Sequence, residues 1–179
     1  MQTFFIILCC IFSTLTVYAG QTCITDSIPA STPNSQLIDN GNGTITDLKT
    51  GLMWKQCLEG VSGSSCETGS PDAFTWQQAL QQPGVVNNVG FAGYTDWRLP
   101  NVKELISIVE EQCKDPAMNL DRFPNTSFPN MSYSADVWSG SPSAGKSGNV
   151  WYVNFNYGDS YAGYRSYNTL AVRLLRGGK

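Results

Sequence analysis

Four cysteines constrain the fold of this chain more than any other feature. Cys23, Cys57, Cys66 and Cys113 lie beyond an apolar N-terminal segment, and an even cysteine count in an exported chain indicates disulfide bonds. Cys57 and Cys66 bracket a short Gly/Ser-rich segment that resembles a closed loop. Among three possible pairings we therefore favour Cys57–Cys66 with Cys23–Cys113. Zinc is the rival interpretation, but the chain has no CxxC spacing and no histidine.

The N-terminal segment, residues 1–19, has the features of a secretory signal peptide. Phe4–Phe12 is apolar and uncharged, and Val17-Tyr18-Ala19 supplies small residues where a signal peptidase cleaves. The apolar run is shorter than the roughly 20 residues that cross a bilayer, so we expect no membrane insertion. The expected product is secreted, extracellular or periplasmic. An uncleaved N-terminal anchor is the alternative.

The remaining chain has the length of one domain. Residues 20–36 are rich in Ser, Thr, Pro and Asn and are predicted to form a linker. Residues 37–179 are predicted to form the domain. Two β-prone runs, 44–47 and 52–55, flank a Gly-containing turn and predict a hairpin.

Two helices are predicted from their capping signals. Thr75 with Gln78 forms a capping box, and Pro83-Gly84 is expected to end the first helix. Asn101 with Glu104 caps the second helix. Its apolar stripe at helical spacing is expected to enter the core, and consists of Val102, Leu105, Ile106 and Val109.

The last part of the chain is predicted to be an antiparallel sheet, with strands near 150–156, 160–166 and 170–175. Alternation in the first of these strands directs Trp151, Val153 and Phe155 to one side, and Tyr152, Asn154 and Asn156 to the other. A hairpin, two helices and a C-terminal sheet together predict an α+β fold.

Charge and residue types exclude several functions. The net charge is −3, and no dense basic stripe indicates a nucleic-acid partner. The chain contains no histidine, which removes Ser-His-Asp and Cys-His catalysis. Carboxylate pairs remain conceivable, Asp96 with Glu104 or Asp121 with Asp136, although turn and capping roles explain them as well. We expect no catalytic activity.

A resident metal or other cofactor is not expected. Asp39, Asn40, Asn42 and Asp47 offer oxygen ligands, but their spacing is not that of an EF-hand, and turn formation is the simpler explanation. Calcium-dependent sugar binding stays open without a motif to support it.

Four tryptophans, Trp54, Trp97, Trp138 and Trp151, lie beside apolar residues and are expected in the core rather than as sugar platforms. Arg98 and Arg173 are likewise expected to be buried or half-buried partners of carboxylates.

The segment from Ser139 to Asn168 has the composition of a recognition surface. Twenty of its thirty residues are Tyr, Ser, Gly or Asn, as in antibody paratopes. The alternative is a plain scaffold, since these residues also suit exposed strands and turns. The predicted ligand-binding residues are Tyr152, Asn154, Asn156, Tyr157, Tyr161, Tyr164, Arg165, Tyr167 and Asn168.

Five segments resemble the Lcl C-terminal domain family, which is named after a bacterial collagen-like adhesin. They are Asp39–Trp54, Gly93–Leu105, Val137–Pro142, Val150–Phe155 and Ala171–Gly178, and the resemblance covers roughly residues 37–179. It implies a C-type-lectin-like fold in which the N-terminal hairpin pairs with the last strand. That fold is shared with formylglycine-generating enzymes, whose late cysteine pair this chain lacks, because no cysteine follows Cys113.

The function expected from residues and resemblance is that of a secreted or surface adhesin, a module that binds a glycan or a surface protein through its C-terminal sheet. The family's adhesin implies a sulfated glycosaminoglycan as one ligand. Three alternatives stay open. They are a secreted carboxylate-dependent enzyme acting on polysaccharide, a diversified receptor of a diversity-generating retroelement, and a structural accessory that forms a homo-oligomer.

Overall fold

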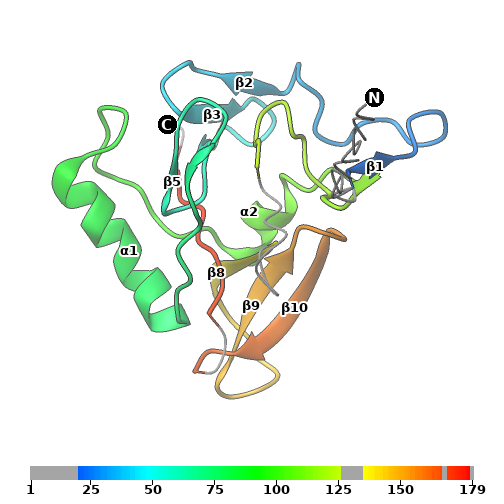
Figure 1. Ribbon diagram of the computed structural model, residues 1–179. Coiled ribbons are helices and arrows are strands. Elements are labelled where there is room, and N and C mark those ends of the chain that lie inside the picture. Colours follow the sequence, from blue (N-terminus) through cyan, green and yellow to red (C-terminus); the bar gives the residue numbers. More distant parts are fainter. Residues whose placement is uncertain (1–19, 126–134, 167–168, 178–179) are drawn as a thin grey trace, which may run out of the picture.

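The computed structural model describes residues 20–125, 135–166 and 169–177, so the predicted signal peptide lies outside the described residues. The described chain forms an α+β fold with mostly antiparallel sheets (Figure 1). Its helices are α1 (Trp76–Val89) and α2 (Val102–Ile106). Its strands are β1 (Thr22–Cys23), β2 (Leu37–Asp39), β3 (Thr44–Asp47), β4 (Met53–Lys55), β5 (Val61–Ser62), β6 (Thr68–Gly69), β7 (Cys113–Lys114), β8 (Asp136–Pro142), β9 (Asn149–Asn154), β10 (Asp159–Tyr164) and β11 (Leu175–Arg176).

The first sheet joins the two ends of the domain. Its strand order is β11-β4-β3-β2, and every pair in it is antiparallel. The predicted hairpin is confirmed as β3 and β4, where Ile45 lies opposite Trp54. On the other side of β4, Trp54 pairs with Leu175 of the last strand, and all three side chains are fully buried. The N-terminal hairpin thus pairs with the last strand of the chain.

The second sheet is built from β8, β9 and β10, in the order β10-β9-β8. Strands β9 and β10 correspond to the predicted strands at 150–156 and 160–166. Strand β8 is a third, earlier strand that the sequence pattern did not reveal, because its Ser-Gly-Ser-Pro end resembles a loop. Among the strands that the structure describes, β10 pairs with β9 alone, so it is an edge strand of this sheet.

The segment 170–175, predicted as the final strand of the second sheet, instead runs between the two sheets. Ala171 forms an isolated parallel bridge with Val137 of β8, and only Leu175–Arg176 form a regular strand, in the first sheet. Its apolar side chains alternate between two hydrophobic clusters, with Ala171 and Leu175 in one and Leu170, Val172 and Leu174 in the other. Burial on both sides explains why every residue of the run except Arg173 is apolar.

Helix α1 continues past the predicted stop at Pro83-Gly84 and ends at Gly90. The capping box of Thr75 and Gln78 is confirmed at its start. Pro83 removes one helical N–H, but Val86 is buried in the second cluster and holds the last turns in place. Gly90, with φ of 77°, supplies the left-handed conformation that ends the helix. Packing therefore outweighs the local helix-breaking signal.

Helix α2 is only five residues long, and this changes which residues its stripe buries. The capping box of Asn101 and Glu104 is confirmed. Leu105 and Val109 are buried as expected, but Ile106 is 42% exposed. The helix ends at Ile106, so the residues beyond it leave the helical phase and Ile108 enters the core instead.

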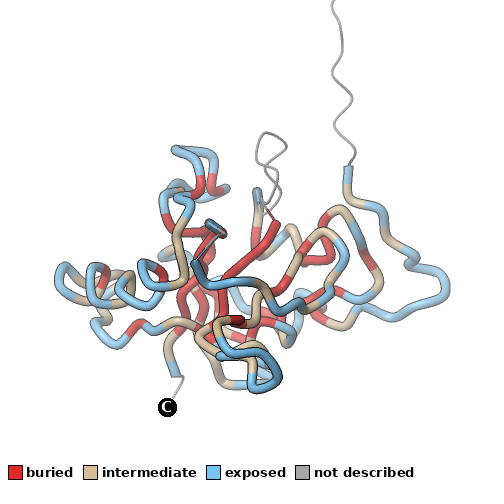
Figure 2. The backbone as a smooth tube through the Cα atoms, turned by 90° about the horizontal axis from the view of Figure 1, so that it is seen from below, coloured by how far each residue is buried: buried red, intermediate tan, exposed pale blue. Residues whose placement is uncertain are grey.

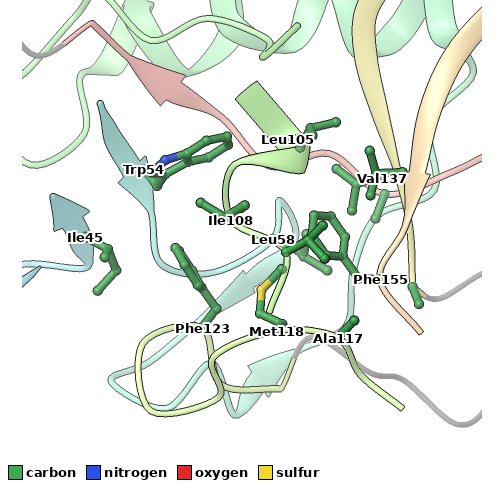
Figure 3. Packing of buried hydrophobic residues seen from close by; sticks show 14 of the residues in the cluster. Ile45, Trp54, Leu58, Leu105, Ile108, Ala117, Met118, Phe123, Val137 and Phe155 are labelled. Carbon is green, nitrogen blue, oxygen red and sulfur yellow. The ribbon is translucent and has the colours of Figure 1, made fainter. Parts of the chain in front are cut away.

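Buried residues lie in the interior segments of the chain (Figure 2), and their side chains form two clusters, the first of which is drawn in Figure 3. Trp54 belongs to the first cluster, and Trp97 and Trp138 belong to the second, so three of the four predicted core tryptophans are confirmed. Trp151 is only half-buried, because it lies opposite Ala162 of the edge strand. Neither described helix has the length and apolarity that a bilayer crossing requires.

Two disulfides have the pairing that the sequence favoured, Cys23–Cys113 and Cys57–Cys66. The first one holds the predicted linker, residues 20–36, against the domain, together with the β1–β7 pairing. The buried Glu110 carboxylate also binds this segment, accepting hydrogen bonds from the backbone N–H groups of Ser31 (2.8 Å) and Thr32 (2.9 Å).

Candidate functional site

The residues of the predicted recognition surface lie on different faces of the second sheet. Strands β8, β9 and β10 lie side by side (Figure 1), and their pairing decides which side chains share a face. Tyr152 of β9 lies on the side opposite Val153, as predicted, but it is half-buried because it packs against the second cluster. The sequence pattern did not reveal that both faces of β9 are covered, since Val153 and Tyr152 contact different clusters.

Three aromatic side chains cross this sheet in register, and we call them the aromatic row: Trp138, Tyr152 and Tyr161. Trp138 pairs with Tyr152, and Tyr152 pairs with Tyr161. The Trp138 and Tyr152 rings meet edge to face at 5.9 Å, and the Tyr152 and Tyr161 rings lie 5.7 Å apart at 30°. Exposure rises along the row from 0% at Trp138 to 44% at Tyr161. The row therefore begins in the core and ends in solvent.

A second set of side chains lies beside the aromatic row, and we call it the polar row: Asp136, Asn154 and Asp159. Asp136 and Asp159 both pair with Asn154, two residues along each strand from the aromatic row and on the same face. The Asn154 side-chain amide donates to Oδ1 of Asp136 (2.6 Å). Asp136 is buried, whereas Asp159 is exposed at the edge.

Burial gives Asp136 an unusual titration. Loss of solvent raises the pKa of its carboxyl to about 6, and the hydrogen bond from Asn154 opposes this change. Asp136 thus changes charge near neutral pH. The polar row was not predicted from the sequence, because neither carboxylate has a local motif and only strand pairing brings them together.

At the outer end of both rows, Tyr161 and Asp159 form a pair. The Tyr161 hydroxyl donates to Oδ2 of Asp159 (3.3 Å). Repulsion between this carboxylate and a tyrosinate raises the pKa of Tyr161 above its usual value. Tyr157, 62% exposed, adds a second aromatic ring next to the same strand end.

Other predicted binding residues lie elsewhere. Tyr164 and Arg165 are exposed at the far end of β10, and strand alternation turns Tyr164 away from the face of Tyr161. Asn156 is half-buried, and its backbone carbonyl accepts a hydrogen bond from Asp115. Tyr167 and Asn168 lie outside the described residues. The structure therefore joins Tyr152, Asn154, Tyr157 and Tyr161, but not the whole predicted set.

The carboxylates of the conceivable catalytic pairs each hydrogen-bond to other residues. Asp96 accepts two hydrogen bonds from Arg176, which lower the pKa of its carboxyl. Glu104 binds Arg98 in a two-bonded arrangement with distances of 2.8 and 2.6 Å. Burial raises the pKa of Glu104, but the bonds from Arg98 and the Asn101 backbone outweigh it and hold the pKa below its usual value.

In the second conceivable pair, Asp121 and Asp136 likewise hydrogen-bond to different residues. Asp121 is exposed and accepts a hydrogen bond from Asn34 (2.7 Å), while Asp136 belongs to the polar row. Arg173 is buried, as predicted, and the charge of Glu59 acts on it. It is fully buried and donates to the backbone carbonyls of Lys55 and Gln56, and burial lowers its pKa to about 9.

The conceivable oxygen ligands near the N-terminus form hydrogen bonds within and beside their own turns. Oδ1 of Asp39 accepts from the backbone N–H of Gly41, and Oδ1 of Asn42 accepts from the Thr44 hydroxyl. Asp47 is buried and accepts bonds from Gln36, Lys49 and Thr50. Within the part of the chain that the structure describes, no group of three or more His, Cys, Asp and Glu side chains is placed to hold a metal ion.

Comparison with known proteins supplies the family. No curated protein matches the chain. The family model of the Lcl C-terminal domain matches residues 43–176, which is more than half of the chain and includes every described helix and strand except β1 and β2. The sequence resemblance is therefore confirmed, and this chain belongs to the Lcl C-terminal domain family.

Proposed function

We propose that this chain is an extracellular recognition module with a C-type-lectin-like fold, and that it binds a glycan at the outer ends of the aromatic and polar rows. The observation that carries the proposal is the exposed Tyr161 ring, stacked on Tyr152 at a sheet edge beside Asp159.

The chemistry of this edge matches a sugar ring. A pyranose presents an apolar face of C–H groups and a rim of hydroxyls that both donate and accept. The Tyr161 ring offers an exposed apolar face, and its contact with Tyr152 orders the ring before a ligand arrives. Asp159 offers carboxylate acceptors at hydrogen-bonding range of the same ring. One apolar platform with a few polar groups is the usual composition of a small-ligand site.

Fold and family support the same function. Pairing of the N-terminal hairpin with the last strand, and two helices packed on the sheets, agree with the topology that a C-type-lectin-like fold requires. Two disulfides suit an oxidising compartment outside the cytoplasm. The family's adhesin attaches to host surfaces, which favours binding over transport or signalling.

We also propose that the module acts by binding and without catalysis. The chain has no histidine, and the surface carboxylates Asp96 and Glu104 are each neutralised by an arginine. A carboxylate held by an arginine has a low pKa and is a poor general acid.

A glycan array tests the proposal with the full chain after residue 19, with and without calcium and at two salt concentrations. Tyr161→Ala should reduce binding to the best array ligand at least tenfold. Tyr164→Ala is the matched control, because it removes an exposed tyrosine from the same strand on the other face, and it should bind as the parent does. Equal binding by the Tyr161 variant, or absence of any glycan ligand, would overturn the proposal.

A further inference from the structure

A cavity lies away from the aromatic row, between the β2–β3 turn, the end of β4 and the β5 loop. Its volume is about 380 Å³, which is within the range of small-ligand sites. Figure 1 shows β3 and β5 at the opposite end of the molecule from β9 and β10. The cavity is therefore separate from the aromatic row.

Gln56 is the decisive residue of this cavity. It lines the cavity and is only 5% exposed. Its backbone N–H donates to Gly43 (2.9 Å) and its backbone carbonyl accepts from Arg173. Its side-chain carboxamide, however, makes no hydrogen bond to any residue that the structure describes. The carboxamide is open to the cavity rather than sealed in the core, so it is free to donate hydrogen bonds to a ligand there and to accept them.

The wall of the cavity adds further polar groups and one aromatic ring. Asn42, Ser62 and Ser64 line it, and the two serine hydroxyls have no partner among the described residues. Phe91 supplies the apolar part and lies against Gly43, where an added Cβ would stand 3.2 Å from the ring. Hydroxyls, amides and one ring form a set that both donates and accepts hydrogen bonds beside an apolar surface.

The charges around the cavity favour a neutral ligand. Lys55 lines the cavity, but its ammonium is 2.6 Å from Glu59 and lies over the Phe91 ring at 4.3 Å. That cation is already compensated, so it has little attraction left for an anion. The other ionised side chain of the lining, Asp39, repels anions.

The wall is also preorganised. Ser62 and Ser64 belong to the short loop that the Cys57–Cys66 disulfide closes. Within this loop Gly63 has φ of +94°, and a Cβ there would lie 2.5 Å from the Glu67 carboxylate. A loop held in one conformation loses little entropy when it binds a ligand.

We propose that this cavity is a binding site for a single neutral sugar unit, whose vicinal hydroxyls donate to and accept from the Gln56 carboxamide. The site is independent of the glycan surface on β10, and it makes the domain a two-site receptor for neutral saccharides.

The test uses the ¹⁵N-labelled chain after residue 19, titrated with neutral methyl glycosides of glucose, galactose, mannose and N-acetylglucosamine. At least one glycoside should shift the amide signals of Asn42, Gln56 and Ser62. Gln56→Met keeps the side-chain volume and removes the carboxamide, so it should weaken binding at least tenfold while the melting temperature stays the same or rises. Gln81→Met, an exposed substitution on α1, is the matched control and should leave binding unchanged.

A second variant, Ser64→Trp, blocks the rim of the cavity at an exposed position and should abolish the same shifts. The proposal is overturned if no glycoside shifts these signals, or if Gln56→Met and Ser64→Trp bind as the parent does. Tyr161→Ala should leave these shifts unchanged, so failure here is distinguishable from failure of the surface on β10.

Discussion

Tyr161 stacks on Tyr152 across β10 and β9, with 5.7 Å between the ring centroids and 30° between the ring planes. Tyr152 in turn meets the buried Trp138 edge to face at 5.9 Å. An exposed ring is thus supported by contacts that reach the hydrophobic core. In the proposed function Tyr161 contacts the ligand and Tyr152 supports its ring, and mutations can distinguish these two roles.

Tyr152→Ala should therefore destabilise the domain more than Tyr161→Ala. Tyr152 is half-buried against the second cluster, and its removal should lower the free energy of unfolding by about 2–3 kcal/mol. Tyr161 is 44% exposed, and its removal should cost less than about 1 kcal/mol. Urea unfolding followed by tryptophan fluorescence measures both values. Equal losses would contradict the order of burial along the aromatic row.

Asp136 should make the stability depend on pH near neutrality. Burial raises the pKa of its carboxyl from 3.8 to about 6, so the folded state favours the protonated form. Its contribution to stability is complete below pH 3.8, and is lost as the pH rises through about 6. A change of roughly two pKa units corresponds to about 3 kcal/mol, which partial solvation reduces to about 1–2 kcal/mol.

Asp136→Asn removes this titration and keeps the side-chain shape. The difference in unfolding free energy between variant and parent should change by about 1–2 kcal/mol between pH 4.5 and pH 7.5, in favour of the variant at the higher pH. Asp159→Asn is the control, because Asp159 is exposed on the same row and should give no comparable change. A flat difference for Asp136→Asn would show that its carboxyl titrates normally.

Glu110→Gln should loosen the N-terminal segment. Burial raises the pKa of Glu110, but hydrogen bonds from Ser31, Thr32 and Gln112 outweigh it and leave the pKa below its usual value. The ionised form therefore stabilises the fold at neutral pH, and this contribution is lost as the pH falls through that lowered pKa. The amide accepts fewer of these bonds, so we expect a loss of about 2–3 kcal/mol at pH 7. Amide hydrogen exchange should rise first at Ser31 and Thr32, and Glu111→Gln, an exposed neighbour, should have little effect.

The two disulfides should differ in their contributions to stability. Cys23–Cys113 joins residues 90 positions apart, whereas Cys57–Cys66 closes a separation of 9. The chain-entropy relation assigns about 4.6 kcal/mol to the long closure and about 2.7 kcal/mol to the short one. Replacing each pair by alanines and measuring urea unfolding without reductant checks the order. A larger loss for the short loop would indicate that its walls also stabilise the surrounding core.

Local chemistry was enough to predict several parts of the fold. Both capping boxes, at Thr75 and at Asn101, involve residues three positions apart and form as predicted. The β3–β4 hairpin depends on a turn between neighbouring runs. The Cys57–Cys66 pairing follows from a loop of a few residues, and the family follows from five segments in order. The caps, the hairpin and the short disulfide are decided by residues close together in the chain, and the family by motifs that can be recognised one by one.

Long-range packing decided what the sequence pattern did not reveal. Burial of Val86 in the core stabilises α1 beyond Pro83. Residues 170–175 pack between the two hydrophobic clusters instead of forming a strand of the second sheet. The candidate sites depend on the same effect, since Asp136 meets Asn154 only through strand pairing, and Gln56 lies beside Phe91 in the cavity only in the folded chain. Local spacing in the sequence was enough for the Cys57–Cys66 pairing and the two capping boxes, because their residues lie close together in the chain. The tertiary structure alone decided which tyrosines share a face and which polar groups are buried, because register and burial depend on segments that meet only when the chain has folded.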